Sequence, residues 1–165
     1  MIPKKHFWSL IEESITMKNS TDKNDQGDTL MYLLTKLPID QIVGFHNRVK
    51  SLREDIESPM MKDIAFMMKY GDNEHAYRGF KNWVISLGEE HFQKAKNSPA
   101  HLLTLKDPNL FVVCRAYFED LDFVASGAYY TISKEKDADW DTVLKRETRI
   151  KELDQKSEGD HEHEH

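Results

Sequence analysis

A short polar segment in the middle of the chain holds the residue types that most readily perform chemistry. Asp72, Asn73, Glu74 and His75 precede a stretch whose apolar residues recur at helical spacing. The first turn of a helix attracts anions and concentrates polar side chains at one point. We therefore consider Asp72, Glu74 and His75 as candidates for a ligand-binding or metal-assisted hydrolytic site, and Lys81 on the same helix as a fourth member. The competing interpretation, which we favour, is that Asp72 or Asn73 caps the helix and Glu74 suits its dipole.

The other clustered metal-ligating residues stand at the extreme C-terminus. His161, His163 and His165 alternate there with glutamates, and imidazole and carboxylate groups both suit transition metals. Such a pattern is also typical of an affinity tag, so we expect at most a chelating tail and no folded metal centre. A helical di-iron site needs Glu-x-x-His from each of two helices, and the body offers only Asp72-x-x-His75. The sequence thus predicts no metal and no cofactor.

Nucleophile and phosphate-binding motifs are missing from the sequence. It contains no Gly-x-Ser-x-Gly elbow, no phosphate-binding glycine loop, no Cys-x-x-Cys and no His-Glu-x-x-His. The single cysteine, Cys114, ends the apolar run Leu110–Cys114, where a thiol is usually buried and inert. A lone cysteine is also what a reducing compartment permits, so we predict a cytoplasmic protein.

Two features point to contact with another protein. Met60, Met61 and Met68 belong to a methionine-rich stretch, and flexible thioethers suit adaptable binding surfaces, although a core role is the more common one. Trp140 stands among three aspartates and is a candidate for a partly exposed contact. These four residues are the candidate partner-binding residues.

Apolar residues recur at spacings of three and four along most of the chain, which favours helices. We expect residues 19–27 to form a loop, with Asp28 capping the helix that follows. The run Leu110–Cys114 is strand-like, but no second strand could pair with it, so a buried helical turn is favoured. The expected helices lie at about 4–17, 28–37, 38–56, 60–70, 73–87, 89–97, 101–105, 118–132 and 140–153.

The fold class that follows is all-α: a compact single domain of about seven to nine helices over residues 1–155. Residues 156–165 contain no apolar side chain and are predicted to form a disordered acidic and histidine-rich tail. No apolar run approaches the roughly 20 residues that a membrane span needs. The net charge of −6 disfavours nonspecific binding to nucleic acid.

Several short motifs resemble a bacterial family catalogued as domain of unknown function 4240. Phe7-Trp8 with Ile11 is similar to its Phe-Trp-x-x-Ile opening. Phe80-Lys81-Asn82-Trp83-Val84-Ile85, followed by Gly88, is similar to its Phe-Arg-x-Trp-Leu-Ile-x-x-Gly segment. The resemblance covers about Phe7 to Tyr130 and implies an all-helical bacterial domain, without bringing a function.

The chain departs from that family pattern at its polar positions. Glu74-His75 stands where the family has paired acids, and Lys81 stands in place of an arginine, whose bidentate fork lysine cannot reproduce. The preserved positions are mostly apolar, which indicates packing. We therefore predict a small cytoplasmic protein-binding or regulatory module without catalytic activity. The alternative is a metal-assisted hydrolase with its site at the Asp72–His75 turn.

Overall fold

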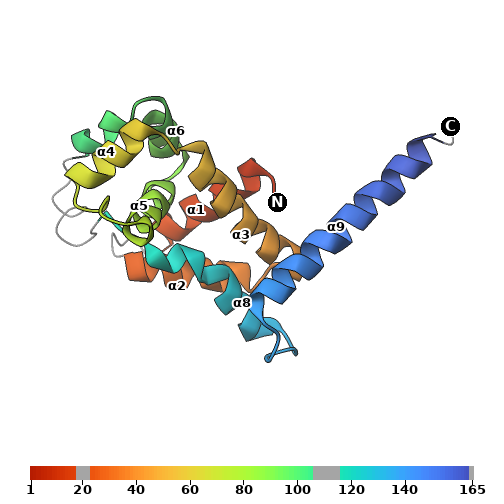
Figure 1. Ribbon diagram of the computed structural model, residues 1–165. Coiled ribbons are helices and arrows are strands. Elements are labelled where there is room, and N and C mark those ends of the chain that lie inside the picture. The colour runs from red at the N-terminus through yellow and green to blue at the C-terminus, as the bar shows by residue number, and fades with distance from the viewer. Residues whose placement is uncertain (18–22, 106–115, 164–165) are drawn as a thin grey trace.

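The structure, a computed structural model, describes residues 1–17, 23–105 and 116–163, and within these ranges it contains helices and no strand (Figure 1). This confirms the predicted all-α fold. The run Leu110–Cys114 lies outside the described residues. No helix in the described part is long and apolar enough to cross a lipid bilayer. The α-helices are α1 (Lys4–Thr16), α2 (Lys23–Leu34), α3 (Ile39–Asp55), α4 (Pro59–Met67), α5 (Glu74–Ser86), α6 (Glu89–Asn97), α8 (Val124–Ile132) and α9 (Trp140–His163), and the short 3-10 helices are η1 (Pro99–Thr104) and η2 (Glu119–Asp122).

The helix ends follow local rules that the sequence displays. The Ser58 hydroxyl accepts a hydrogen bond from the Met61 amide at 3.0 Å and caps α4, whose first residue is a proline. Asn73 caps α5 in the same way, because its Oδ1 accepts from the Ala76 amide at 2.8 Å. Gly88, between α5 and α6, has a φ of 105°, which L side chains rarely adopt. Of the two residues considered as the cap of this helix, Asp72 and Asn73, the structure selects Asn73.

Helix α2 begins at Lys23, earlier than the predicted start at Asp28, so part of the predicted loop is helical. The reason is tertiary. The Gln26 amide donates hydrogen bonds to Ser14 Oγ at 3.2 Å and to the Ser86 carbonyl at 3.0 Å, which ties this turn to α1 and α5. A Cβ added at Gly27 would lie 3.5 Å from the Phe118 ring. Packing of the first turn therefore overrides the polar composition that favoured a loop.

Aromatic side chains from four helices fill the core around α5. Trp83 and Phe80 of α5 are fully buried, and so are Phe7 of α1, Phe45 of α3 and, almost entirely, Phe92 of α6. The Phe7 and Phe45 rings lie 4.9 Å apart between centroids, and those of Phe80 and Trp83 lie 5.8 Å apart. Helix α5 contacts α3, α4, α6 and η2, and α2 packs on α1 and α8. Burying these large side chains together supplies most of the stabilisation of the fold.

The N-terminal residues are held against α3. The Arg48 guanidinium donates two hydrogen bonds to the Ile2 carbonyl, at 3.0 Å and 2.8 Å. A Cβ added at Gly44 would lie 2.8 Å from the Ile2 side chain, so only glycine permits this approach.

Helix α9 leaves the body of the molecule after its first turns, as Figure 1 shows. Its buried residue Val143 packs with Val43 of α3 and Tyr129 of α8 in a second, smaller core. Beyond this contact, residues 149–157 are exposed. The predicted tail, residues 156–165, begins within α9, whose backbone is helical to His163; the disorder of that segment stays a prediction.

Candidate functional site

The turn before α5 forms a small hollow of about 240 Å³. Asp72 and Glu74 line it together with Asn73, Gly71, Lys62 and Tyr77. Both carboxylates are exposed, and the Asn73 side chain is occupied in capping α5. Burial is the main reason that the pKa of Tyr77 is raised, and the nearby Glu57 carboxylate raises it further. The hollow is therefore an exposed polar surface lined in part by Tyr77, whose raised pKa keeps its hydroxyl protonated.

His75 does not line this hollow; its side chain contacts Tyr117, two residues before η2. Its Nε2 lies 2.8 Å from the Tyr117 hydroxyl and 3.4 Å from Glu119 Oε1. Tyr117 lies directly over Gly79 of α5, where a Cβ would overlap its ring. The Tyr117 pKa is raised by desolvation and by the Glu119 charge. The His75 side chain is 56% exposed, so this contact is a surface hydrogen-bond chain.

Lys81 has a different neighbour. Its Nζ donates to Glu57 Oε2 at 2.8 Å and lies 4.3 Å from the centroid of the Tyr77 ring. The four residues predicted for a ligand site thus divide into three groups: Asp72 with Glu74, His75 alone, and Lys81 alone. Within the described ranges, no group of three or more His, Cys, Asp or Glu side chains has a geometry that could hold a metal ion. The convergence on which the hydrolase hypothesis depends is not seen.

The predicted partner-binding residues have unequal exposure. Met60 is 55% exposed, whereas Met61 is fully buried in the core, which removes it from the candidates for contact with a partner. Met68 is half-buried. Trp140 is partly exposed, as predicted, but its ring packs against His46 and Tyr129, and its indole nitrogen is buried.

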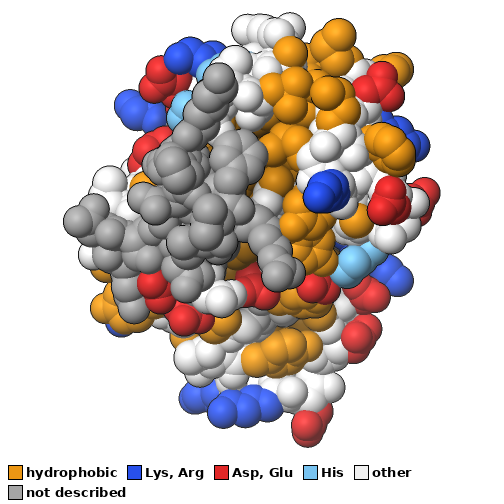
Figure 2. Space-filling model, turned by 90° about the vertical axis from the view of Figure 1, so that its left-hand side faces the viewer, with side chains coloured by type: hydrophobic (Ala, Val, Ile, Leu, Met, Phe, Trp, Pro, Cys, Tyr) orange, Lys and Arg blue, Asp and Glu red, His pale blue; other side chains and the backbone are white. Residues whose placement is uncertain are grey.

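Helix α4 carries the most exposed phenylalanine of the described chain. Phe66 is 66% exposed and the neighbouring Met67 is 64% exposed. With Met60, Lys62 and Lys69 they form what we call the α4 surface. Figure 2 shows the side of the molecule on which α4 lies, where hydrophobic side chains gather in a band beside scattered charges. Met67 belongs to the methionine-rich stretch for which a core role is the more common one, and sequence reasoning did not single out Phe66. The signal present in the sequence was an apolar run, Ile64–Met68, too continuous for one face of a helix.

A second polar cluster, not found from the sequence, joins α3, α5 and η2. Arg53 Nη1 donates to Asp122 Oδ1 and, at 3.0 Å, to Asn82 Oδ1, while Asn82 Nδ2 donates to Asp122 Oδ2 at 3.0 Å. Arg78 Nε lies 3.4 Å from the same carboxylate. The Arg53 and Asp122 side chains are only 14% and 16% exposed, and Asn82 is fully buried. Since these buried side chains are paired with one another, the cluster links α3, α5 and η2.

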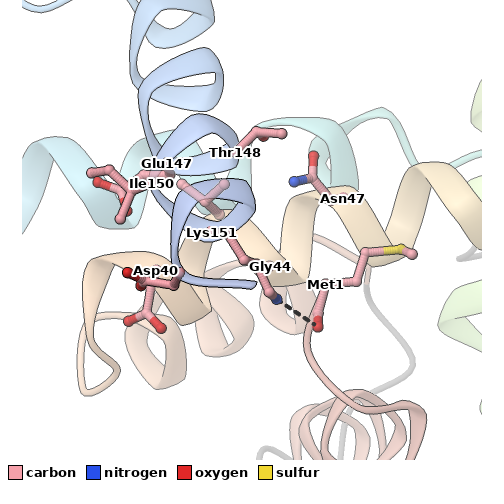
Figure 3. Close-up of a pocket in the computed structure, with 10 residues that line it drawn as sticks. Met1, Asp40, Gly44, Asn47, Glu147, Thr148, Ile150 and Lys151 are labelled. Atoms are coloured by element: carbon pink, nitrogen blue, oxygen red, sulfur yellow. Dashed lines mark hydrogen bonds between the residues drawn. The ribbon is translucent and has the colours of Figure 1, made fainter. Parts of the chain in front are cut away.

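A hollow of about 570 Å³ lies between α3 and α9 (Figure 3). Its wall carries both signs of charge, with Asp40 on α3 and with Glu147, Lys151 and Asp154 on α9. Lys151 Nζ reaches across to the Met1 carbonyl at 3.3 Å. The hollow is large enough for a small ligand, but its polar groups do not converge on one point in Figure 3.

These features define an all-helical fold in the described part of the chain. The sequence profile described as "Protein of unknown function (DUF4240)" matches residues 2–131, from the segment before α1 to the penultimate residue of α8. The chain therefore belongs to this family of proteins of unknown function, and α9 lies beyond the matched region. No curated protein and no solved structure matches the chain.

Proposed function

We propose that this protein is a binding module whose α4 surface docks on another protein. The observation that supports this most directly is the exposure of three large apolar side chains, Met60, Phe66 and Met67, on a helix of nine residues. The opposite side of α4 is well packed, because Met61, Ile64 and Ala65 are buried. The helix therefore needs no exposed apolar residues to stay folded. Large apolar side chains exposed together on one short helix are typical of an interaction site.

The charges beside the α4 surface indicate the chemistry of the partner. Lys62 and Lys69 are exposed, and neither forms an ion pair with any residue that the structure describes. On a chain with a net charge of −6, two free lysines next to Phe66 make this surface locally favourable for an acidic neighbour. We infer a partner protein that offers an apolar ridge with Asp or Glu residues at its margin.

We also propose that the module works in the bacterial cytoplasm as a regulator, without catalytic activity of its own. The single cysteine supports a reducing compartment. The separation of His75, Lys81 and the Asp72–Glu74 pair into different contacts supports a role in binding rather than chemistry.

Photocrosslinking in living cells tests the α4 surface directly. We would replace Phe66 with the photoreactive amino acid benzoylphenylalanine and express the full chain in the organism that encodes it. The expected result is one adduct of defined mass. It should weaken when Met67 is changed to serine, and also when Lys62 and Lys69 are both changed to glutamate, because either change removes part of the docking surface.

The matched control places the same photoreactive residue at Tyr32, an aromatic position on α2 that is 54% exposed. An adduct at position 66 that is missing at position 32 supports the proposal. Identical adducts at both positions, or an adduct at position 66 that survives the lysine charge reversal and M67S alike, would contradict it. Circular dichroism of each variant checks that the helical fold is kept.

A further inference from the structure

Two histidines from different elements meet on the side of the molecule formed by α6 and η1. His91 Nδ1 lies 3.1 Å from His101 Nε2, and the two rings are tilted by only 22° with centroids 5.4 Å apart. The contact is set by the chain reversal at Ser98-Pro99, which folds η1 back onto α6, and the His101 amide donates to the Ser98 carbonyl at 2.9 Å. Both imidazoles are half-buried, so solvent and solutes reach them.

The spacing of the two nitrogens is that of a pair of metal ligands. Imidazole nitrogens bind Zn²⁺ at about 2.0–2.1 Å, which places two such nitrogens about 3.3 Å apart at a tetrahedral angle and about 2.9 Å apart at a right angle. The observed 3.1 Å lies between these values.

The charges around the pair are mixed. The Glu90 carboxylate interacts electrostatically with both imidazoles, which favours a cation between them. Lys94 opposes this, because its Nζ pairs with Glu90 Oε1 at 2.9 Å and adds a positive charge close to His101. Lys94 is therefore expected to weaken cation binding without touching the cation.

We propose that His91 and His101 form a two-imidazole site for a first-row divalent transition metal ion, with Zn²⁺ as the representative case and water completing its coordination. The inference is independent of the α4 surface. The competing explanation is that the pair only makes a hydrogen bond between neutral imidazoles, which links α6 to η1.

Calorimetric titration with ZnCl₂ at pH 7.5 separates the two explanations. The full chain carries H161Q, H163Q and H165Q, which prevent the C-terminal histidines from binding the metal; we call it the tail-silenced protein. We expect one ion per chain, binding weakened about tenfold or more by H91Q and by H101Q, and tighter binding in K94A. The matched control, H6Q, replaces a half-buried histidine of α1 and should leave the affinity unchanged.

A second measurement avoids changing the histidine pair at all. Addition of paramagnetic Co²⁺ to the same tail-silenced protein should broaden the amide NMR signals of residues 90–104 and spare those of α1. The proposal is overturned if no stoichiometric binding occurs, if H6Q weakens binding as much as H91Q does, or if Co²⁺ broadens signals without preference for α6 and η1. The pair would then be a structural hydrogen bond only.

Discussion

Arg53 links three elements of the fold through one guanidinium group. It bonds to Asn82 of α5 and to Asp122 of η2 from its own position near the end of α3. Because both charged partners are mostly buried, removing one leaves the other desolvated without full compensation. Such a loss is more costly than the loss of an ion pair that lies in water.

The Arg53 cluster gives a prediction at the scale of one residue. Arg53→Ala should lower the free energy of unfolding by roughly 3 kcal/mol, since Asn82 and Arg78 are then the partners left to Asp122 among the described residues. Urea unfolding followed by circular dichroism measures this loss. Lys94→Ala is the matched control, because it breaks the exposed pair with Glu90 and should leave the free energy of unfolding almost unchanged. Equal losses in the two variants would show that the Arg53 cluster does not hold the elements together.

At the scale of elements, the base of α9 is held to α3 by an aromatic contact. The His46 ring meets Trp140 edge-on, at 88° and 5.6 Å between centroids. Burial is the main cause that lowers the pKa of His46, and Arg53 and Lys50 lower it further, while Asp122 and Asp141 act in the opposite direction. In the folded protein His46 is therefore held in its neutral form more strongly than in the unfolded chain.

This lowered pKa makes stability depend on pH in a definite direction. As the pH falls through the unfolded pKa of about 6.5, the unfolded chain takes up a proton at His46 before the folded protein does. The contribution is fully present above that pH and is lost below it. We expect unfolding free energy to fall between pH 7.5 and pH 5.5, and to fall less in His46→Gln. Parallel urea titrations at the two pH values test this, and an equal drop in both proteins would refute it.

At the scale of the whole molecule, the chain consists of a packed body and a helix that extends from it. The family match ends within α8, and α9 packs into a core through its first turns, beyond which Lys151 reaches the Met1 carbonyl. Ile150 and Leu153 of α9 are about half exposed. The end of α9 therefore adds little burial to the fold.

Removal of the final ten residues tests this division. A chain that ends at Gln155 should unfold at the same denaturant concentration as the full chain, with a difference of about 0.5 kcal/mol or less, because Lys156 and Ser157 are exposed and the backbone of α9 has left the body before them (Figure 1). Thermal and urea unfolding of the two chains measure the difference. A loss of several kcal/mol would mean that residues 156–165 pack on the body and belong to the domain.

Much of the fold follows from short stretches of sequence. The spacing of Phe7, Phe45, Phe80 and Trp83 within their segments predicts which faces are buried, and all four are buried. Asn73 caps the helix that it precedes, and Gly88 allows the positive φ between α5 and α6. Both roles involve only neighbouring residues, so they can be recognised in the sequence. Apolar periodicity and helix capping involve residues that are close in the sequence, so they can be recognised without knowing the tertiary structure.

The arrangement of polar side chains depended on contacts between segments that lie far apart in the chain. His75 meets Tyr117 across 42 positions, and Arg53 meets Asp122 across 69, so no spacing in the sequence could pair them. The same holds for α4: which of its five consecutive apolar residues faces water depends on where α5 and η1 pack against it. Helices form from local pattern, whereas sites form where helices meet, and the meeting is set by the packing of the whole core.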